Sequence, residues 1–225
     1  MPSKLFFNYQ RIREKVFAAC RKSGRKEKNV LIIAVSKNRS GKEIRSVYEV
    51  GLRNFGENRV QEADEKYEAF PSNCILHMVG HLQSNKAGRA VELFDVIHSV
   101  DSVHLAEKIS HRAQEIGKLQ QILVQVNITG EESKGGVSPA ELENVLQQIL
   151  ALPNVRVIGL MTMAPLGADE AMCRKCFGHL RSLRDQMEQK FGVKLPHLSM
   201  GMTGDFEIAV EEGATMIRIG RGLFD

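Results

Sequence analysis

The chain has 225 residues, 43% of them hydrophobic and 26% charged, and no low-complexity tract, which excludes a disordered or fibrous protein. Its 31 Lys and Arg against 27 Asp and Glu leave a net charge of +4, too small a surplus to indicate a nucleic-acid or membrane surface. A basic segment at residues 21–28 lacks aromatic side chains, and we interpret it as a solvated helix end.

The four cysteines are too few for a disulfide scaffold in a chain of this length, and no signal peptide precedes them. No apolar stretch reaches the roughly 18 residues that a membrane span requires. We therefore expect a cytoplasmic protein with neither membrane nor nucleic acid as a partner. A basic amphipathic helix over residues 4–22 leaves an organelle transit peptide as an alternative, against which Glu14 and the scarcity of serine argue.

After an N-terminal helix, short apolar runs alternate with longer segments of helical period, a pattern typical of parallel strands covered on both faces. The strands are predicted at residues 30–36, 53–58, 75–80, 95–100, 121–128, 154–161, 197–202 and 215–220. The helices between them are predicted at 41–51, from 58 to about 69, at 102–117, 138–151, 169–191 and 204–212. A loop is predicted at 129–139.

Eight strands in a chain of this length correspond to about 28 residues per strand and helix, the spacing of a closed barrel. The predicted fold is therefore an α/β protein: a single (β/α)8 TIM-type barrel with an extra N-terminal helix, forming one domain over residues 1–225. An open doubly wound sheet is the alternative.

Common motifs of phosphate loops, zinc proteases and serine hydrolases are absent from the sequence. Cys173, Cys176 and His179 have a helical spacing and lack a second cysteine pair, so we expect no metal there. His77 and His81 flank a predicted turn, and we interpret them as hydrogen-bonded loop histidines.

Lys37 directly follows the first predicted strand, at the barrel end where active sites lie. An apolar surround for its stem would lower the pKa of the amine, and the neutral amine can attack an aldehyde. A lysine that only extends its charge to solvent is the structural alternative.

Small and hydroxyl-bearing residues follow the last two predicted strands: Ser199, Gly201, Thr203, Gly204, Gly220 and Gly222. Barrels often bind phosphate there, with a short helix aimed at the anion, and the helix predicted to start near Gly204 suits that role. Tight turns are the alternative. Arg218 ends the eighth strand and is expected to point inward beside Lys37. A lysine, a phosphate site and an interior arginine together describe pyridoxal 5′-phosphate (PLP) better than a sugar phosphate.

Several sequence blocks in order resemble the pyridoxal phosphate homeostasis protein family, small PLP-binding relatives of the barrel domain of alanine racemase. The blocks are AVSK at 34–37, FGENRVQE at 55–62, GHLQSNK at 80–86, HSVDS at 98–102, QVNITGEESKGG at 125–136, GLMTMAP at 159–165 and LSMGMTGDFEIAVEEGATMIRIG at 198–220. The likeness extends over nearly the whole chain.

The resemblance implies a non-catalytic protein that buffers and delivers PLP, with PLP-dependent apoenzymes as recipients, and we expect a monomer. It implies these cofactor contacts: a Schiff base at Lys37, phosphate contacts from Ser199, Thr203 and the backbone near Gly220, Arg218 at the pyridine nitrogen, and Asn58 near the cofactor. Arg59 stands where the family usually has Tyr, which would change the rim of the pocket, and the sequence ends slightly early, which would shorten the last helix.

A PLP-dependent amino-acid racemase is the alternative function. Racemisation requires an acid and a base on opposite faces of the cofactor, and Lys37 can serve only one face. The tyrosines Tyr9, Tyr48 and Tyr67 all fall in predicted helices. The always-protonated Arg218 would also donate to the pyridine nitrogen and disfavour the protonated ring that stabilises a carbanion. The carrier function is therefore favoured.

Overall fold

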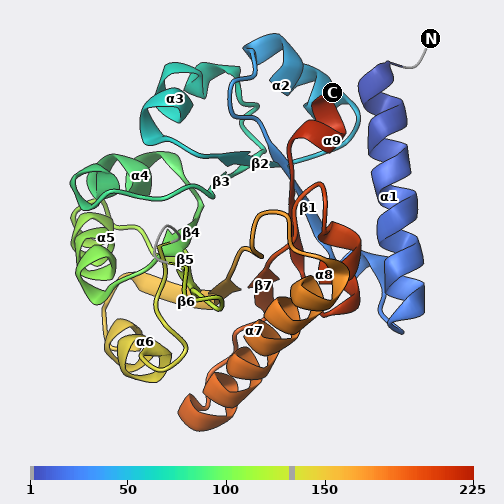
Figure 1. The fold of residues 1–225 in the computed structure, drawn as a ribbon. Helices are drawn as coiled ribbons and strands as arrows, with labels where there is room; N and C mark the ends of the chain where they lie inside the picture. The colour runs from blue at the N-terminus through green and yellow to red at the C-terminus, as the bar shows by residue number, and fades with distance from the viewer. Residues whose placement is uncertain (1–2, 132–134) are drawn as a thin grey trace.

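A computed structural model describes residues 3–131 and 135–225, and its eight parallel strands close into a barrel in which each strand pairs with its sequence neighbours (Figure 1). The strands are β1 (Leu31–Val35), β2 (Asn54–Glu57), β3 (Ile75–Met78), β4 (Val96–Val100), β5 (Gln120–Gln125), β6 (Val155–Met161), β7 (His197–Ser199) and β8 (Met216–Ile219). The predicted (β/α)8 fold is confirmed, and the open-sheet alternative is wrong because β1 pairs with β8.

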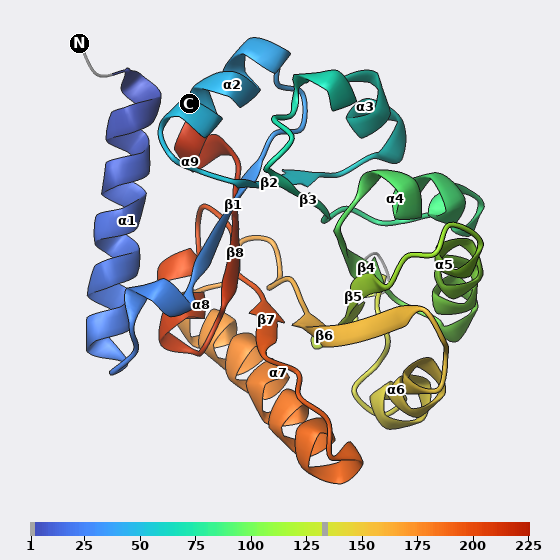
Figure 2. The same cartoon turned by 180° about the vertical axis from the view of Figure 1, so that it is seen from behind.

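Helices cover the outside of the barrel (Figure 2). They are α1 (Lys4–Lys22), α2 (Gly41–Glu49), α3 (Val60–Glu65), α4 (Ala87–Leu93), α5 (Val103–Glu115), α6 (Leu142–Leu150), α7 (Glu170–Phe191), α8 (Phe206–Glu211) and α9 (Arg221–Phe224), with short 3-10 helices η1 (Glu27–Asn29), η2 (Tyr67–Ala69) and η3 (Ser84–Lys86). No helix in the two described ranges is long and apolar enough to cross a membrane.

Several helices differ from the sequence prediction; α3 ends at Glu65 rather than near residue 69, and α9 was not predicted. The prediction lacked α4, a short helix whose Gly88 lowers the helix propensity of the segment. Helix α6 begins at Leu142 rather than near 138, because Ser138 and Glu141 form a turn in which the Glu141 amide donates to the Ser138 hydroxyl at 3.3 Å. Helix α8 also begins later than predicted, at Phe206. The centre of the loop predicted at 129–139 lies outside the described residues.

The N-terminal helix α1 lies outside the ring of helices, beside α8 and α9 (Figure 1). The Ser3 side chain caps its first turn by accepting from the Phe6 amide. Its buried face carries Ile12 and Val16, and the Asn8 amide donates to the Leu223 carbonyl oxygen at 3.1 Å. Helix α1 thereby holds the end of the chain against the barrel.

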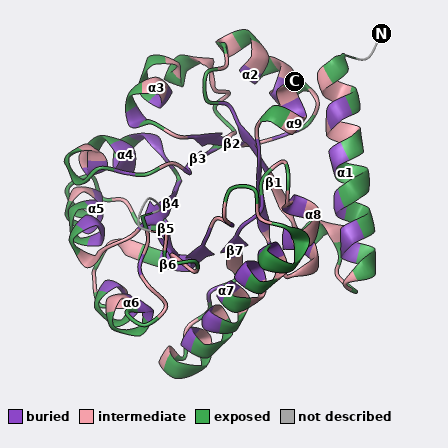
Figure 3. Cartoon of the chain, viewed as in Figure 1, coloured by how far each residue is buried: buried purple, intermediate pink, exposed green. Residues whose placement is uncertain are grey.

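Two apolar layers form the core, and most strand residues are buried (Figure 3). The larger layer lies between the strands and the helices, and the smaller one contains Ile33, Val96, Leu123, Ile158, Met161 and Met216. Side chains alternate along a strand, so every second residue points into the barrel. Four buried polar residues occupy such inward-pointing positions in β3, β4, β7 and β8: His77, His98, Ser199 and Arg218.

Candidate functional site

Four predicted site residues follow neighbouring strands at one rim of the barrel. Strands β7, β8, β1 and β2 are consecutive neighbours, and all are parallel, so their carboxyl ends lie on the same rim. Lys37 follows β1, Asn58 follows β2, Gly220 follows β8, and Thr203 lies in the loop after β7. The fold therefore brings these four residues to one edge.

The backbone on both sides of Lys37 is held by side chains of α3 and its C-cap. The Lys66 ammonium donates to the Ser36 carbonyl oxygen at 2.8 Å, and the Glu62 carboxylate accepts from the Asn38 amide. Asn38 has a φ of 57°, in the left-handed region that closes the turn. The Lys37 side chain is exposed, so the apolar surround expected for its stem is wrong. The Lys66 and Glu62 side chains thus fix the backbone from which the Lys37 amine projects.

A buried carboxylate lies beneath that turn. Glu57, the last residue of β2, is fully buried, and its Oε1 accepts from the Ser36 hydroxyl at 2.5 Å and from the Lys66 ammonium at 2.9 Å. Its Oε2 is buried without a hydrogen-bond partner among the described residues. Burial raises the pKa of Glu57, and its contacts with Ser36 and Lys66 oppose that shift.

The loops after β7 and β8 are joined by a hydrogen bond from the Gly222 amide to the Thr203 hydroxyl at 3.3 Å. Gly220 lies against β1, since a Cβ built on it would sit 3.6 Å from the Val35 carbonyl oxygen. Helix α8 begins at Phe206, two residues after the start expected near Gly204, and just before it the Asp205 carboxylate accepts from the Met202 amide at 2.5 Å. A hydroxyl and backbone amides therefore form this part of the rim.

Ser199 is not brought to this group. It is fully buried inside the barrel, where its hydroxyl accepts from Arg218 Nη1 at 2.6 Å and lies 2.8 Å from His98 Nδ1. Arg218 Nη2 donates to the Thr162 carbonyl oxygen at 3.0 Å. Burial lowers the pKa of Arg218 to about 10, which leaves the guanidinium charged at neutral pH. Ser199 and Arg218 thus form an interior pair below the rim.

Two buried histidines continue this interior pair, and sequence reasoning missed their connection. His98 Nε2 lies 2.9 Å from His77 Nδ1, and His77 Nε2 lies 3.0 Å from Asn54 Oδ1. His77 belongs to β3, so the expectation of a loop histidine is wrong for it, whereas His81 is exposed in the following loop beside Asp101. The detectable signal was polar residues at alternate positions of otherwise apolar strands.

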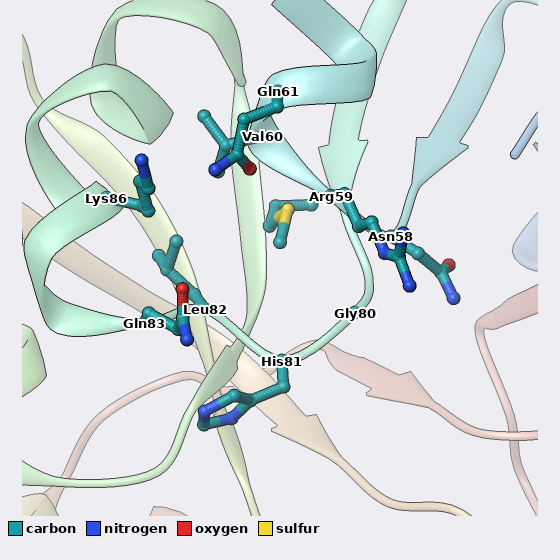
Figure 4. A pocket seen from close by; sticks show the side chains of 10 residues that line it. Asn58, Arg59, Val60, Gln61, Gly80, His81, Leu82, Gln83 and Lys86 are labelled. Atoms are coloured by element: carbon teal, nitrogen blue, oxygen red, sulfur yellow. The ribbon is translucent and has the colours of Figure 1, made fainter.

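A pocket of about 550 Å³ opens between the loops that follow β2 and β3 (Figure 4). Arg59 and Lys86 lie on opposite sides of it, and His81 projects from the loop after β3. The loops touch at Gly80, where an added Cβ would lie 2.3 Å from the Asn58 carbonyl oxygen, so a side chain there would displace the Asn58 backbone. Of the predicted cofactor residues, only Asn58 lines this pocket.

The cysteine pair considered for metal lies on the buried face of α7. Burial raises the pKa of the Cys173 thiol, which disfavours the thiolate that binds zinc. Across residues 3–131 and 135–225, no cluster of three His, Cys, Asp or Glu side chains has an arrangement that could hold a metal ion.

The sequence matches the family "Alanine racemase, N-terminal domain" over residues 7–225. It is 44% identical to the pyridoxal phosphate homeostasis protein of Aquifex aeolicus over 215 residues, which cover 95% of this chain and 94% of that protein. The protein of the same name from Escherichia coli K12 is 35% identical over 228 residues, with 96% and 94% covered.

Solved structures give the same relationship. The structure of PipY from Synechococcus elongatus with PLP bound has a TM-score of 0.83 and 41% identity, and the match covers 95% of this chain and all of that one. An alanine racemase from Clostridium difficile shares only the fold, with a TM-score of 0.77 at 16% identity over 98% of this chain and 56% of that one. The chain therefore belongs to the pyridoxal phosphate homeostasis protein family, built on the barrel of the alanine racemase N-terminal domain family.

Proposed function

We propose that this protein binds PLP at the rim formed by β7, β8, β1 and β2 and acts as a carrier that buffers and delivers it. PLP bound to PipY and the name of the relatives support this proposal. The observation within this chain that carries it is the buried cation of Arg218 below the rim, next to the strand that leads to Lys37.

The residues present fit PLP. The described hydrogen bonds of the Arg218 side chain go to the Ser199 hydroxyl and the Thr162 carbonyl oxygen, and no carboxylate neutralises it among the described ion pairs. A buried guanidinium without a carboxylate partner can donate a hydrogen bond to an acceptor such as a pyridine nitrogen. The Thr203 hydroxyl and the nearby backbone amides suit a phosphate.

We assign each residue a separate task. Lys37 projects its amine from the fixed turn after β1, Thr203 and the backbone near Gly220 face the phosphate, and Asn58 flanks the group from β2. PLP supplies an aldehyde that a lysine amine captures reversibly. We no longer propose Ser199 as a phosphate contact, because its hydroxyl accepts a hydrogen bond from Arg218 inside the barrel. Its task is to orient that arginine.

We further propose that the protein has no racemase activity. Tyr9 lies in α1, Tyr48 in α2 and Tyr67 in η2, so no tyrosine follows a strand of the barrel in the described ranges. Lys37 alone serves one face of the cofactor. A charged Arg218 at the pyridine nitrogen would keep that nitrogen an acceptor, which disfavours carbanion chemistry. The carrier is proposed to be a cytoplasmic monomer whose recipients are PLP-dependent apoenzymes.

The site is tested by borohydride reduction of the PLP-loaded protein followed by peptide mass mapping. The pyridoxyl group is expected on Lys37, and Lys37→Ala is expected to lose covalent retention completely. Lys86→Ala provides a matched control, because Lys86 is also a lysine near the rim but lines the separate pocket. Unchanged stoichiometry in Lys37→Ala would overturn the assigned site.

The function is tested by mixing PLP-loaded protein with PLP-free recipient enzymes. Activity should return faster than the same amount of free PLP explains. In parallel, L-alanine is incubated with the protein in D₂O, and both its chirality and its α-deuteration are followed. Multiple turnovers that disappear in Lys37→Ala would replace the carrier with a racemase-type enzyme.

A further inference from the structure

Five polar side chains form one continuous hydrogen-bonded chain through the barrel interior. The contacts run from Arg218 to Ser199 at 2.6 Å, on to His98 at 2.8 Å, to His77 at 2.9 Å, and to Asn54 at 3.0 Å. The chain crosses from β8 through β7, β4 and β3 to the start of β2. All but Asn54 are buried, so water cannot substitute for a missing partner.

The protons in this chain can be arranged in only one way when both histidines are neutral. Asn54 Oδ1 only accepts, so His77 carries its proton on Nε2 and accepts at Nδ1. His98 must then donate from Nε2 and accept at Nδ1. The single Ser199 proton goes to His98, and its lone pair faces Arg218, which only donates.

Burial and neighbouring charge keep both imidazoles neutral. Burial lowers the pKa of His77 to about 3, and that of His98 lies well below its ordinary value for the same reason. The charged and titratable groups that act on the pair are Arg218 on β8 and His197 on β7, and both disfavour a further positive charge. A proton added to His98 would place an N–H against the Ser199 hydroxyl that serves Arg218.

We propose that His77 and His98 are positioning residues: through Ser199, they hold the Arg218 guanidinium in one orientation by a hydrogen-bond chain of fixed direction. Because the Ser199 proton is committed to His98, the serine always offers Arg218 a lone pair. The carbonyl of Thr162 supplies the second fixed acceptor, so two contacts define the plane of the guanidinium. In the proposed function, on which this part rests, the same orientation aims Arg218 at the pyridine nitrogen.

The direction of the chain is tested by NMR on the full-length protein labelled with ¹⁵N-histidine, both loaded with PLP and after its removal. Two of the seven histidines should appear as neutral Nε2–H tautomers that do not titrate between about pH 5.5 and 8. Assignment follows from the signals that disappear in His77→Gln and His98→Asn. An Nδ1–H tautomer at either residue, or titration in this range, would overturn the proposal.

The positioning role is tested with Ser199→Ala and a matched control, Ser99→Ala. Ser99 is also a buried barrel serine, but its hydroxyl has no partner among the described residues. Ser199→Ala should shift or broaden the side-chain N–H signals of Arg218 and weaken PLP retention about tenfold, whereas Ser99→Ala should change neither. Ser199→Thr, which keeps the hydroxyl, should restore the Arg218 signals.

The outcomes separate the two proposals. Failure of PLP to bind would remove the carrier function, yet the tautomers and the Arg218 signals would still report on the chain. If PLP binds to Lys37 but Ser199→Ala leaves both the Arg218 signals and PLP retention unchanged, the positioning role is wrong and the carrier function stands. Equal changes in Ser199→Ala and Ser99→Ala would reduce the effect to general packing of the barrel.

Discussion

The rim and the interior of the barrel hold their polar residues by different means. At the rim, Lys37 is exposed and Thr203 is half-buried, and their positions depend on the turns that carry them. In the interior, Ser199 and Arg218 are buried and connected side chain to side chain. The rim therefore presents its polar side chains to solvent, whereas the interior keeps its hydrogen-bonded side chains away from it.

The largest effect is expected at Lys66, which supports the turn of Lys37 from the end of α3. The Lys66 side chain is 13% exposed and its ammonium pairs with the fully buried Glu57, so its removal leaves that carboxylate buried without a cation. Lys66→Met should lower the free energy of unfolding by about 3–5 kcal/mol at neutral pH. It should also release the Ser36 carbonyl, and so loosen the turn of Lys37. Urea denaturation measures the first effect, and the rate of PLP attachment measures the second.

Lys190→Met is the matched control, since Lys190 is 51% exposed and pairs with Glu143 at the surface, where ion pairs contribute less than about 1 kcal/mol. The Lys66→Met loss should shrink at lower pH, because a protonated Glu57 needs no cation. Equal losses in both variants would show that the Glu57 carboxylate does not need Lys66.

A comparison of PLP with pyridoxal as ligands distinguishes the contacts proposed at the rim from those proposed in the interior. Thr203→Ala removes a hydroxyl proposed to face the phosphate, so it should weaken PLP binding about tenfold and leave binding of pyridoxal, which lacks the phosphate, nearly unchanged. Ser199→Ala acts through Arg218 at the ring and should weaken both ligands by similar factors. Titrations followed by absorbance measure all four affinities. If Ser199→Ala weakened the binding of PLP but not of pyridoxal, Ser199 would be a phosphate contact.

The buried histidines predict a pH dependence of stability. The pKa of His77 in the folded protein is about 3, and its ordinary value is 6.5, so the unfolded chain binds more protons between these values. Stability from the neutral imidazole is complete above about pH 6.5 and is lost as the pH falls toward 3, at about 1.4 kcal/mol per pH unit. The pKa of His98 is lowered in the same way, mainly by burial, and Arg218 and His197 lower it further.

His77→Gln should reduce the slope of unfolding free energy against pH by about 1.4 kcal/mol per unit in this window. His111→Gln is the control, because the His111 side chain is 74% exposed on α5. Thermal or urea unfolding at several pH values measures both slopes. Identical slopes in the wild type and His77→Gln would mean that His77 is already protonated in the folded state.

Sequence reasoning predicted the rim better than the interior, for physical reasons. The eight strands could be located because continuous apolar runs mark parallel strands, and strand ends placed Lys37 at the rim. The interior contacts join residues far apart in sequence: His98 and Ser199 are separated by 101 positions. Only the closed barrel, with its alternate residues directed inward, brings such partners together.

The partner of a hydroxyl, the first residue of a helix and the exposure of a side chain could not be predicted from the sequence either. A hydroxyl such as that of Ser199 suits a phosphate as well as an arginine, and the sequence does not show that this one is buried and accepts from Arg218. Helix α8 begins at Phe206, and a pattern of apolar residues does not locate a helix end to within two residues. The exposure of Lys37 depended on the loops around it, which the sequence does not place.

The smallest effect is expected outside both regions, on α7. Cys173 and Cys176 are buried in the outer core, and burial raises the pKa of the Cys173 thiol, so it remains protonated at neutral pH. Zinc binding requires thiolates and about four ligands, and the helical spacing places His179 a further turn along. Metal analysis of the purified protein should therefore find no stoichiometric zinc, and Cys173→Ala should leave the metal content unchanged. One zinc per chain that is lost in Cys173→Ala would give α7 a binding role separate from both the rim and the interior.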